Sequence, residues 1–338
     1  VAPEDVEQAK ALLDNIDDTS QLADDDLVDN NDSAKLQQKG TLITMCQLLG
    51  MNCNTPTDIH FSFAGFRKRG GQTDIHTDGF GIVFFEKNPD PSQGNGKAGI
   101  RQFHDDKPSF CSPVADLVNS YPIKAMNVIS HIRKATQGTN CLANTHPFVR
   151  EVWGEEWAFA HNGQLQMDFI DQLSPVPTHY QPVGTTDSEM AFCYLLNRLK
   201  SQFSEPPSDE VLFQFLTTIC RELSALGLFN CLISNGDWQL AYAGSLLFFI
   251  TRKAPFGEAK LADSELAIDF SEVTSQTDKV TLITTIPLTY NEHWQQLYVD
   301  ECLMFRDGDI LFKDTPDNPT RLTIEEGIAI ARKVGASL

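Results

Sequence analysis

The sequence has no paired-cysteine motif and no long apolar run. Its eight cysteines are scattered, without a Cys-x-x-Cys pair or a Cys/His spacing suited to zinc, which is typical of reduced thiols in a cytosolic protein. No apolar run approaches the roughly 20 residues of a membrane helix, and no basic segment precedes a short apolar one as in a signal peptide. We therefore expect a soluble cytoplasmic protein without a membrane partner.

Positive charge is also scarce. The chain has 26 Lys and Arg residues against 46 Asp and Glu residues, a net charge of −20, and lacks the basic stripe that nucleic-acid binding requires. No glycine-rich loop followed by Lys-Ser or Lys-Thr is present, so ATP binding is not expected. His60, His76 and His104 have no metal-binding spacing, so we expect solvated or capping roles for them, and neither a metal nor another cofactor.

The first 45 residues differ in composition from the rest of the chain. Residues 1–45 contain 11 acidic residues, 3 basic residues and no aromatic residue, so they have too little apolar surface to build a core. We predict that 1–45 is a disordered acidic extension or a pro-segment, that 46–312 is one domain, and that 313–338 is a C-terminal tail with a short helix.

From residue 46 onward, short strand-like runs outnumber helical ones. Apolar and alternating runs predict strands near 46–53, 79–86, 99–104, 125–133, 156–161, 229–234, 238–243, 246–252 and 279–286. An Asp-Gly pair predicts a hairpin within 302–312. Helical spacing predicts helices near 58–69, 113–120, 187–200 and 208–226, and the tract 87–97 is expected to be an exposed loop. Many strands with few long helices indicate an α+β fold with helices packed on sheets.

Four short motifs contain candidate chemistry. They are MCQLLG (45–50), SHIRKAT (130–136), FAHNGQL (159–165) and GTTDSE (184–189). Each alone has an ordinary structural interpretation. Cys46 can be a buried strand cysteine, Arg133 can pair with a surface carboxylate, and Asn-Gly can be a turn. The segment from Thr186 to Glu189 fits a helix capping box whatever the function.

Together, these motifs contain the parts needed to hydrolyse the side-chain amide of glutamine. A cysteine at the start of a mature chain has a free α-amine, whose pKa of ~7.7–8.0 suits a base for its own thiol. Asn162 and Gly163 can donate side-chain and backbone N–H groups to a developing oxyanion. Arg133 supplies a planar fork for a carboxylate, and Asp187 at a helix start supplies a counter-charge for an ammonium group.

The order of the motifs resembles that of the class II (Ntn-type) glutamine amidotransferases, in their stand-alone YafJ-like branch. MCQLLG, SHIRKAT, NTHPF, AFAHNGQL and VGTTDSE carry the resemblance, which covers about residues 45 to 311. It implies a four-layer αββα sandwich with Cys46 as the nucleophile. It also implies that Asn162 and Gly163 form the oxyanion hole, and that Arg133 and Asp187 form the clamp for glutamine.

Two further residues of these motifs are candidates for the site. Thr136 ends SHIRKAT, and His146 lies in NTHPF. A role for His146 in orienting a loop near the site and a purely structural role both stay open.

The resemblance also bears on where an active chain begins. The catalytic chains of this family begin at the cysteine, usually after removal of one initiator methionine, and Met45-Cys46 matches that pair. Residues 1–45 are then either an upstream segment that is not normally translated or a pro-segment that is removed before activity. We favour the first interpretation.

The resemblance implies hydrolysis of glutamine or another γ-glutamyl compound through a γ-glutamyl thioester, with release of ammonia or an amine. The acceptor is expected to be a separate synthase or other protein, or there is none. The alternative is a non-catalytic regulatory or scaffold subunit that retains the fold and binds a partner enzyme. The intact set of candidate residues weighs against that alternative.

Overall fold

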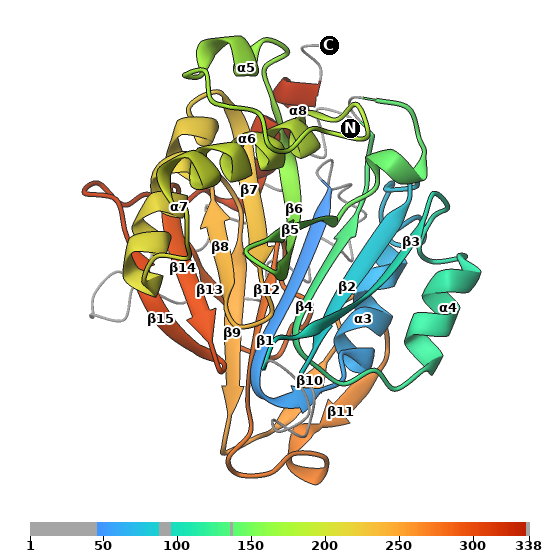
Figure 1. Cartoon of the computed structure of the whole chain (residues 1–338). Coiled ribbons are helices and arrows are strands. Elements are labelled where there is room, and N and C mark those ends of the chain that lie inside the picture. Colours follow the sequence, from blue (N-terminus) through green and yellow to red (C-terminus); the bar gives the residue numbers. More distant parts are fainter. Residues whose placement is uncertain (1–45, 88–95, 136–137, 336–338) are drawn as a thin grey trace.

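The computed structural model describes residues 46–87, 96–135 and 138–335. The segment 1–45, most of the expected loop at 87–97, and Thr136 therefore lie outside the described residues. Two antiparallel sheets pack face to face, and helices cover their outer faces (Figure 1). This arrangement confirms the predicted α+β fold, a four-layer αββα sandwich.

The first sheet has seven strands in the order β13-β9-β12-β1-β4-β2-β3. Their bounds are β1 (Gln47–Thr57), β2 (Phe80–Glu86), β3 (Gly99–Asp105), β4 (Ala125–Ile132), β9 (Phe248–Lys253), β12 (Lys279–Thr284) and β13 (Gln295–Gln296). The central strand β1 pairs with β4 on one side and with β12 on the other. Cys46 directly precedes β1, so its position is fixed by a strand that is paired along both edges.

The second sheet has six strands in the order β15-β14-β8-β7-β6-β5. Their bounds are β5 (Phe148–Val152), β6 (Glu155–Leu165), β7 (Gly227–Ser234), β8 (Gln239–Ala243), β14 (Glu301–Arg306) and β15 (Asp309–Asp314). Asp307 and Gly308 form the turn between β14 and β15 with positive φ angles of 53° and 75°. This is the left-handed geometry that an Asp-Gly hairpin turn adopts, and it confirms the hairpin predicted from the sequence.

The longer helices pack on the sheets. Their bounds are α3 (His60–Phe66), α4 (Pro113–Ser120), α6 (Asp187–Gln202), α7 (Asp209–Ser224) and α8 (Ile324–Gly335). The first two share a core with the first sheet, and α6 and α7 share one with the second sheet. The helix expected in the C-terminal tail is α8, whose Ile328 and Ala331 belong to the same core as α3. No helix within the described residues combines the length and apolarity needed to cross a membrane.

Alternation along β1 divides its side chains between two cores. Leu49 and Met51 belong to the core beneath α3, whereas Leu48 belongs to the core between the sheets, as the period of two in a strand requires. Gly50 also faces the opposing sheet, where a Cβ would lie 2.9 Å from Gln239 Nε2. The close approach of the two sheets near the start of β1 therefore depends on this glycine.

The sequence analysis did not predict the shortest elements, and one of its alternative interpretations of a motif is wrong. It did not predict β5, the two-residue strand β13, the short helix α5 (Phe169–Gln172), or the small hairpin of β10 (Glu258–Lys260) and β11 (Ala267–Asp269). The alternative that Asn162-Gly163 forms a turn is wrong, because both residues lie inside β6 and pair with Asn230 and Phe229 of β7. A local turn signal was overridden by pairing with a distant strand.

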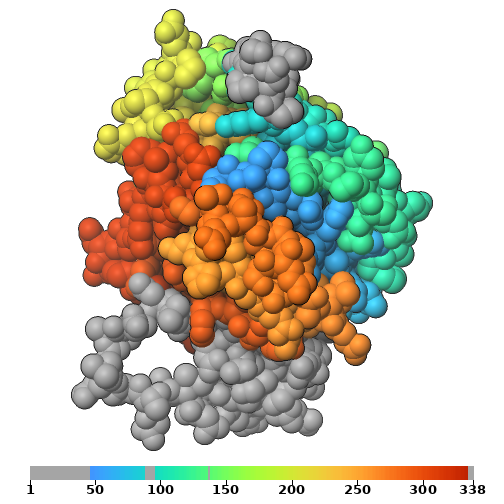
Figure 2. Space-filling model, turned by 90° about the horizontal axis from the view of Figure 1, so that it is seen from below, coloured from blue at the N-terminus to red at the C-terminus, as the bar shows by residue number. Residues whose placement is uncertain are grey.

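Seen from below, segments far apart in sequence share one face of the molecule. Figure 2 shows the orange residues around β10 and β11 beside the blue residues near the N-terminal end of the fold. The ring of Phe270 packs edge-on against Phe61 at 5.6 Å between centroids. Leu261 belongs to the core that contains α3. This late segment therefore helps to cover the first sheet.

Candidate active site

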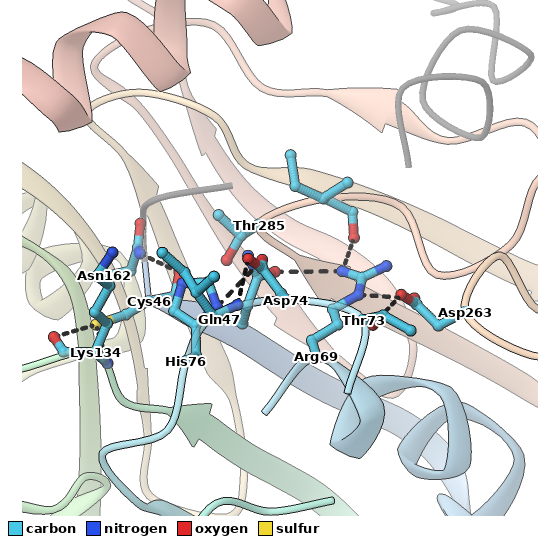
Figure 3. A network of polar contacts seen from close by, with 12 residues as sticks. Cys46, Gln47, Arg69, Thr73, Asp74, His76, Lys134, Asn162, Asp263 and Thr285 are labelled. Atoms are coloured by element: carbon cyan, nitrogen blue, oxygen red, sulfur yellow. Dashed lines mark hydrogen bonds and ion pairs between the residues drawn. The ribbon is translucent and has the colours of Figure 1, made fainter. Parts of the chain in front are cut away.

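Cys46 lies directly before β1 and is held by the main chain that follows β4. The N–H of Lys134 donates to the sulfur at 3.1 Å, and the thiol donates to the Lys134 carbonyl at 3.3 Å (Figure 3). Burial raises the pKa of the Cys46 thiol to about 11, although the Lys134 N–H and the charge of Arg133 act in the opposite direction. At neutral pH this thiol is therefore protonated, and it requires a base before it can act as a nucleophile.

Asn162 and Gly163 reach the cysteine from the other sheet. The side-chain Nδ2 of Asn162 donates to the main-chain oxygen of Cys46. Gly163 has a φ of 151°, and a Cβ at this position would lie only 1.9 Å from the Leu228 carbonyl oxygen. No larger residue fits there without displacing β7, so the glycine is required by close backbone packing as well as by any catalytic role.

Asp187 is the first residue of α6. Thr186 caps this helix, with Oγ1 accepting from the N–H of Glu189 at 3.2 Å, as the predicted capping box requires. Asp187 Oδ2 accepts from the N–H of Leu165 at 2.7 Å, and Oδ1 accepts from the N–H of Ser188 at 2.9 Å. A carboxylate at a helix start is favoured by the helix dipole, so the negative charge is fixed at the pocket wall.

In a complete capping box the carboxylate of Glu189 would accept from the backbone N–H of the N-cap residue Thr186, but here it has other partners. It accepts from the backbone N–H groups of Val183 and Gly184 and pairs with Arg150 at 2.6 Å. The segment that leads into α6 is therefore tied to β5, which carries Arg150. This network fixes the entry to the helix that presents Asp187.

Arg133 follows β4 and turns its guanidinium toward the segment after it. It donates to the carbonyl oxygens of Gly138 and Thr139 and to Asn140 Oδ1, at 3.3 to 3.5 Å. These distances are long for hydrogen bonds to a guanidinium. A planar guanidinium is the side-chain group best suited to hold a carboxylate through two parallel hydrogen bonds.

One small cavity brings most of the candidate residues together. Its walls include Cys46, Arg133, His146, Gly163 and Asp187, and its volume is about 20 Å³. This volume accommodates about one water molecule. Of the predicted site residues, Asn162 contacts Cys46 directly, and Thr136 lies outside the described residues.

Two buried histidines lie against this cavity, and one of them was not predicted. The rings of His131 and His146 are 4.2 Å apart between centroids. Within the described residues, none of their four ring nitrogens has a hydrogen bond of good geometry, although His131 lies close enough to the main chain of His161 for a weak one. Burial, followed by the charges of nearby groups that include Arg133, holds the pKa of both histidines well below the ordinary value. Both rings are therefore neutral at physiological pH.

A third buried histidine, His161, precedes Asn162 and has both nitrogens paired. Nε2 lies 3.1 Å from the Leu228 carbonyl, which can only accept, so this nitrogen carries the proton. Nδ1 then accepts from the hydroxyl of Ser188 at 2.8 Å. Burial lowers the pKa of His161, while the charge of Asp187 opposes this shift. His131 and His161 lie inside motifs that the sequence had singled out, so the signal for them was present but unused.

A second polar network, centred on Arg69, holds the start of β1 through Gln47 (Figure 3). Arg69, 1% exposed, pairs with Asp263 at 2.8 Å. It also donates to the main-chain oxygens of Ile286 and Pro287 at 2.9 and 2.7 Å, and to Gln47 Oε1 at 3.3 Å. Removing one partner of a buried pair is costly, so this arginine fixes the residue next to Cys46.

One expectation about histidines is wrong. His76 is completely buried rather than solvated, and its Nδ1 lies 3.1 Å from Asp74 Oδ2. His60 is partly exposed and bonds to the Tyr121 carbonyl at 2.8 Å, as expected for a capping role. Across the described residues, no group of three or more His, Cys, Asp or Glu side chains is arranged to hold a metal ion.

Comparison with known proteins identifies the family of this chain. The family model for class-II glutamine amidotransferases matches residues 45–327. The chain belongs to this family. A protein of Haemophilus influenzae, provisionally named a glutamine amidotransferase, is 48% identical over 266 residues, covering 78% of this chain and 85% of that protein. The similarly named YafJ of Escherichia coli is 47% identical over 266 residues, covering 78% of this chain and 99% of YafJ.

A solved structure supports the same conclusion. The crystal structure of a predicted glutamine amidotransferase from Pseudomonas aeruginosa is 41% identical in sequence and matches with a TM-score of 0.60. The match covers 79% of this chain and 100% of that one. Membership in the class II glutamine amidotransferases supports the use of glutamine as an amide donor, and the family match begins at the residue before Cys46.

Proposed function

We propose that the protein hydrolyses the side-chain amide of glutamine, or of another γ-glutamyl compound, with Cys46 as an N-terminal nucleophile. The observation that carries the proposal is the meeting of Cys46, Arg133, Gly163 and Asp187 around one cavity. These residues come from two sheets and a helix, and they supply a thiol, a cation, a backbone donor and an anion. Such a set matches the reacting amide and the two charged ends of an α-amino acid.

The proposed reaction has two covalent steps. The Cys46 thiolate attacks the δ-carbonyl carbon, and the negative charge that develops on oxygen is stabilised by Nδ2 of Asn162 and the N–H of Gly163. The C–N bond then breaks, and ammonia or an amine leaves with a proton. Water attacks the resulting γ-glutamyl thioester, the C–S bond breaks, and glutamate and the thiol are released. Arg133 binds the α-carboxylate and Asp187 the α-ammonium group throughout.

The base in this mechanism is the α-amino group of Cys46, which exists only in a chain that begins at this residue. A thiol with a pKa of about 11 holds its proton at neutral pH, whereas an α-amine has a pKa of ~7.7–8.0. The amine can therefore accept the thiol proton during attack. The ammonia passes either to a separate acceptor protein or to solvent.

The test uses protein that begins at Cys46, verified by intact mass. Incubation with glutamine should release ammonia and glutamate in equal amounts, and rapid acid quenching should trap a γ-glutamyl adduct on the peptide that contains Cys46. Absence of both ammonia and adduct, with glutamine and with γ-glutamyl amides alike, would favour a scaffold subunit that retains only the fold.

A further inference from the structure

Asn162 is held at both ends of its side-chain amide. Its Nδ2 donates to the main-chain oxygen of Cys46, and its Oδ1 accepts from Nδ2 of Asn230 at 2.8 Å. Asn230 lies directly opposite Asn162 in the ladder between β6 and β7. Neither asparagine has exposed surface, so water cannot replace these partners without a change in packing.

The main chain after β8 sets the orientation of Asn230. The N–H of Ser245 donates to Asn230 Oδ1 at 2.8 Å, and a backbone N–H can only donate, so this end of the amide must be the oxygen. Nδ2 of Asn230 then faces Ser245 Oγ at 2.7 Å and Asn162 Oδ1. One fixed N–H group therefore orients two side-chain amides in series, and the second of them ends at the cysteine.

We infer that Asn230 is a positioning residue that keeps the Nδ2 of Asn162 directed toward the reacting carbonyl. The inference rests on the proposed function, in which Asn162 donates to the oxyanion. An asparagine amide offers a donor at one end and an acceptor at the other. A flipped Asn162 would place an oxygen lone pair against the developing negative charge. The bond from Asn230 opposes that flip, because breaking it would leave a buried acceptor without a donor.

The sandwich contains a matched control for this pair. Asn52 donates from Nδ2 to Asn127 Oδ1 at 2.8 Å, and Asn127 donates to the Gly236 carbonyl at 2.9 Å. Both residues are 1% exposed. Asn52 lies six residues beyond Cys46, which is roughly 20 Å along a strand. A substitution at Asn127 therefore makes the same chemical change to a buried asparagine pair, but far from the cavity.

The experiment compares Asn230→Asp with Asn127→Asp in protein that begins at Cys46. The carboxylate of the first variant still accepts from Ser245 but cannot donate to Asn162, so Asn162 turns its Nδ2 away from Cys46. We expect kcat for glutamine hydrolysis to fall ~10- to 10³-fold, where the upper limit is the rate loss caused by removing one oxyanion donor. KM should change less than about threefold. The Asn127→Asp variant should keep kcat within about threefold of wild type.

The pH dependence of kcat distinguishes the positioning role of Asn230 from a merely structural one. A protonated carboxyl group in the Asn230→Asp variant can donate to Asn162 Oδ1 and so restore the native orientation. We expect the ratio of variant to wild-type kcat to rise as the pH falls. Taking the ratio removes titrations common to both proteins, such as those of the α-amine and the nearby His131, His146 and His161. A flat ratio across the pH range would overturn the inference.

Further variants separate the possible failures. If Asn162→Ala hydrolyses glutamine as fast as wild type, the oxyanion role in the proposed function is wrong. If Asn162→Ala is impaired but Asn230→Asp turns over like wild type, only the positioning role of Asn230 is wrong. Should Asn230→Asp not fold, Asn230→Ala replaces it. That variant should lower kcat by ~10-fold or more with little change in KM, and wild-type turnover would count against the inference.

Discussion

The main chain of Lys134 positions the sulfur of Cys46 with both of its polar groups, at 3.1 Å from N and 3.3 Å from O. The two residues are 88 positions apart and meet because β1 and β4 are neighbours in the sheet. Since the contact uses backbone atoms, the Lys134 side chain can vary without releasing the thiol. The position of the Cys46 sulfur, the proposed nucleophile, is thus a property of the sheet.

Replacing the thiol should abolish catalysis without unfolding the protein. We expect Cys46→Ala to lower glutamine hydrolysis by more than ~10³-fold, because no covalent step remains, while the melting temperature changes little. Cys53→Ala is the matched control. Cys53 lies on β1, the strand that follows Cys46, is 1% exposed and bonds to the carbonyl oxygens of Ala125 and Met126. The Cys53→Ala variant should be less stable than wild type but keep its activity. Activity of Cys46→Ala within tenfold of wild type would contradict the nucleophile assignment.

Replacing the guanidinium group of Arg133 by an ammonium group should weaken binding of glutamine. In Arg133→Lys, a point charge replaces a planar group that can hold a carboxylate through two bonds. We expect KM for glutamine to rise ~10-fold or more, with a smaller change in kcat, measured by ammonia release over a range of glutamine concentrations. Arg101→Lys is the control, because Arg101 pairs with Glu86 on the surface. An unchanged KM in Arg133→Lys would show that another group binds the α-carboxylate.

Residues 1–45 should silence the enzyme while they remain attached. In such a chain, the nitrogen of Cys46 is an amide, with no lone pair available to accept the thiol proton. General-base assistance is typically worth ~10²–10⁴-fold in rate, so we expect a loss of at least that size. The measurement compares two preparations, one shown by intact mass to begin at Val1 and one beginning at Cys46. Equal rates would contradict the free-amine mechanism.

The buried histidines should make the fold sensitive to acid. The pKa values of His131 and His146 are well below normal in the folded protein, so below about pH 6.5 the unfolded chain binds more protons than the folded one. The contribution of these two histidines to the free energy of unfolding is fully present above that pH. It is lost as the pH falls toward their pKa values in the folded protein. Each histidine contributes a slope of up to about 1.4 kcal/mol per pH unit.

Urea unfolding at a series of pH values between 7 and 5 measures this slope. We expect His131→Phe to have a shallower dependence of unfolding free energy on pH than wild type, whatever its stability at pH 7. The aromatic ring keeps much of the packing against His146, and only the titration is removed. An identical slope in the variant and wild type would show that His131 is not kept neutral by the fold.

Local chemistry in the sequence was sufficient for the larger elements. Apolar and alternating runs located the strands of the two sheets except β5, β13, β14 and β15, because side-chain alternation depends only on the chain itself. The Asp-Gly pair located β14 and β15 as a hairpin. The cap from Thr186 to Glu189 and the turn at Asp307-Gly308 were also predictable, since each depends on a few adjacent residues. Cys46 and Arg133 were singled out as candidates only when several distant motifs were taken together.

Only the tertiary structure decided which polar groups are buried together. The bond from Asn162 to Cys46 joins residues 116 positions apart, and the bond from Asn230 to Asn162 spans 68. Neither contact has a local sequence signal, because each exists only after two strands pair or two sheets pack. The same holds for His131, whose neutrality follows from burial rather than from its neighbours in sequence. Desolvation and long-range hydrogen bonds are properties of the folded sandwich, and they decide the chemistry available at the cysteine.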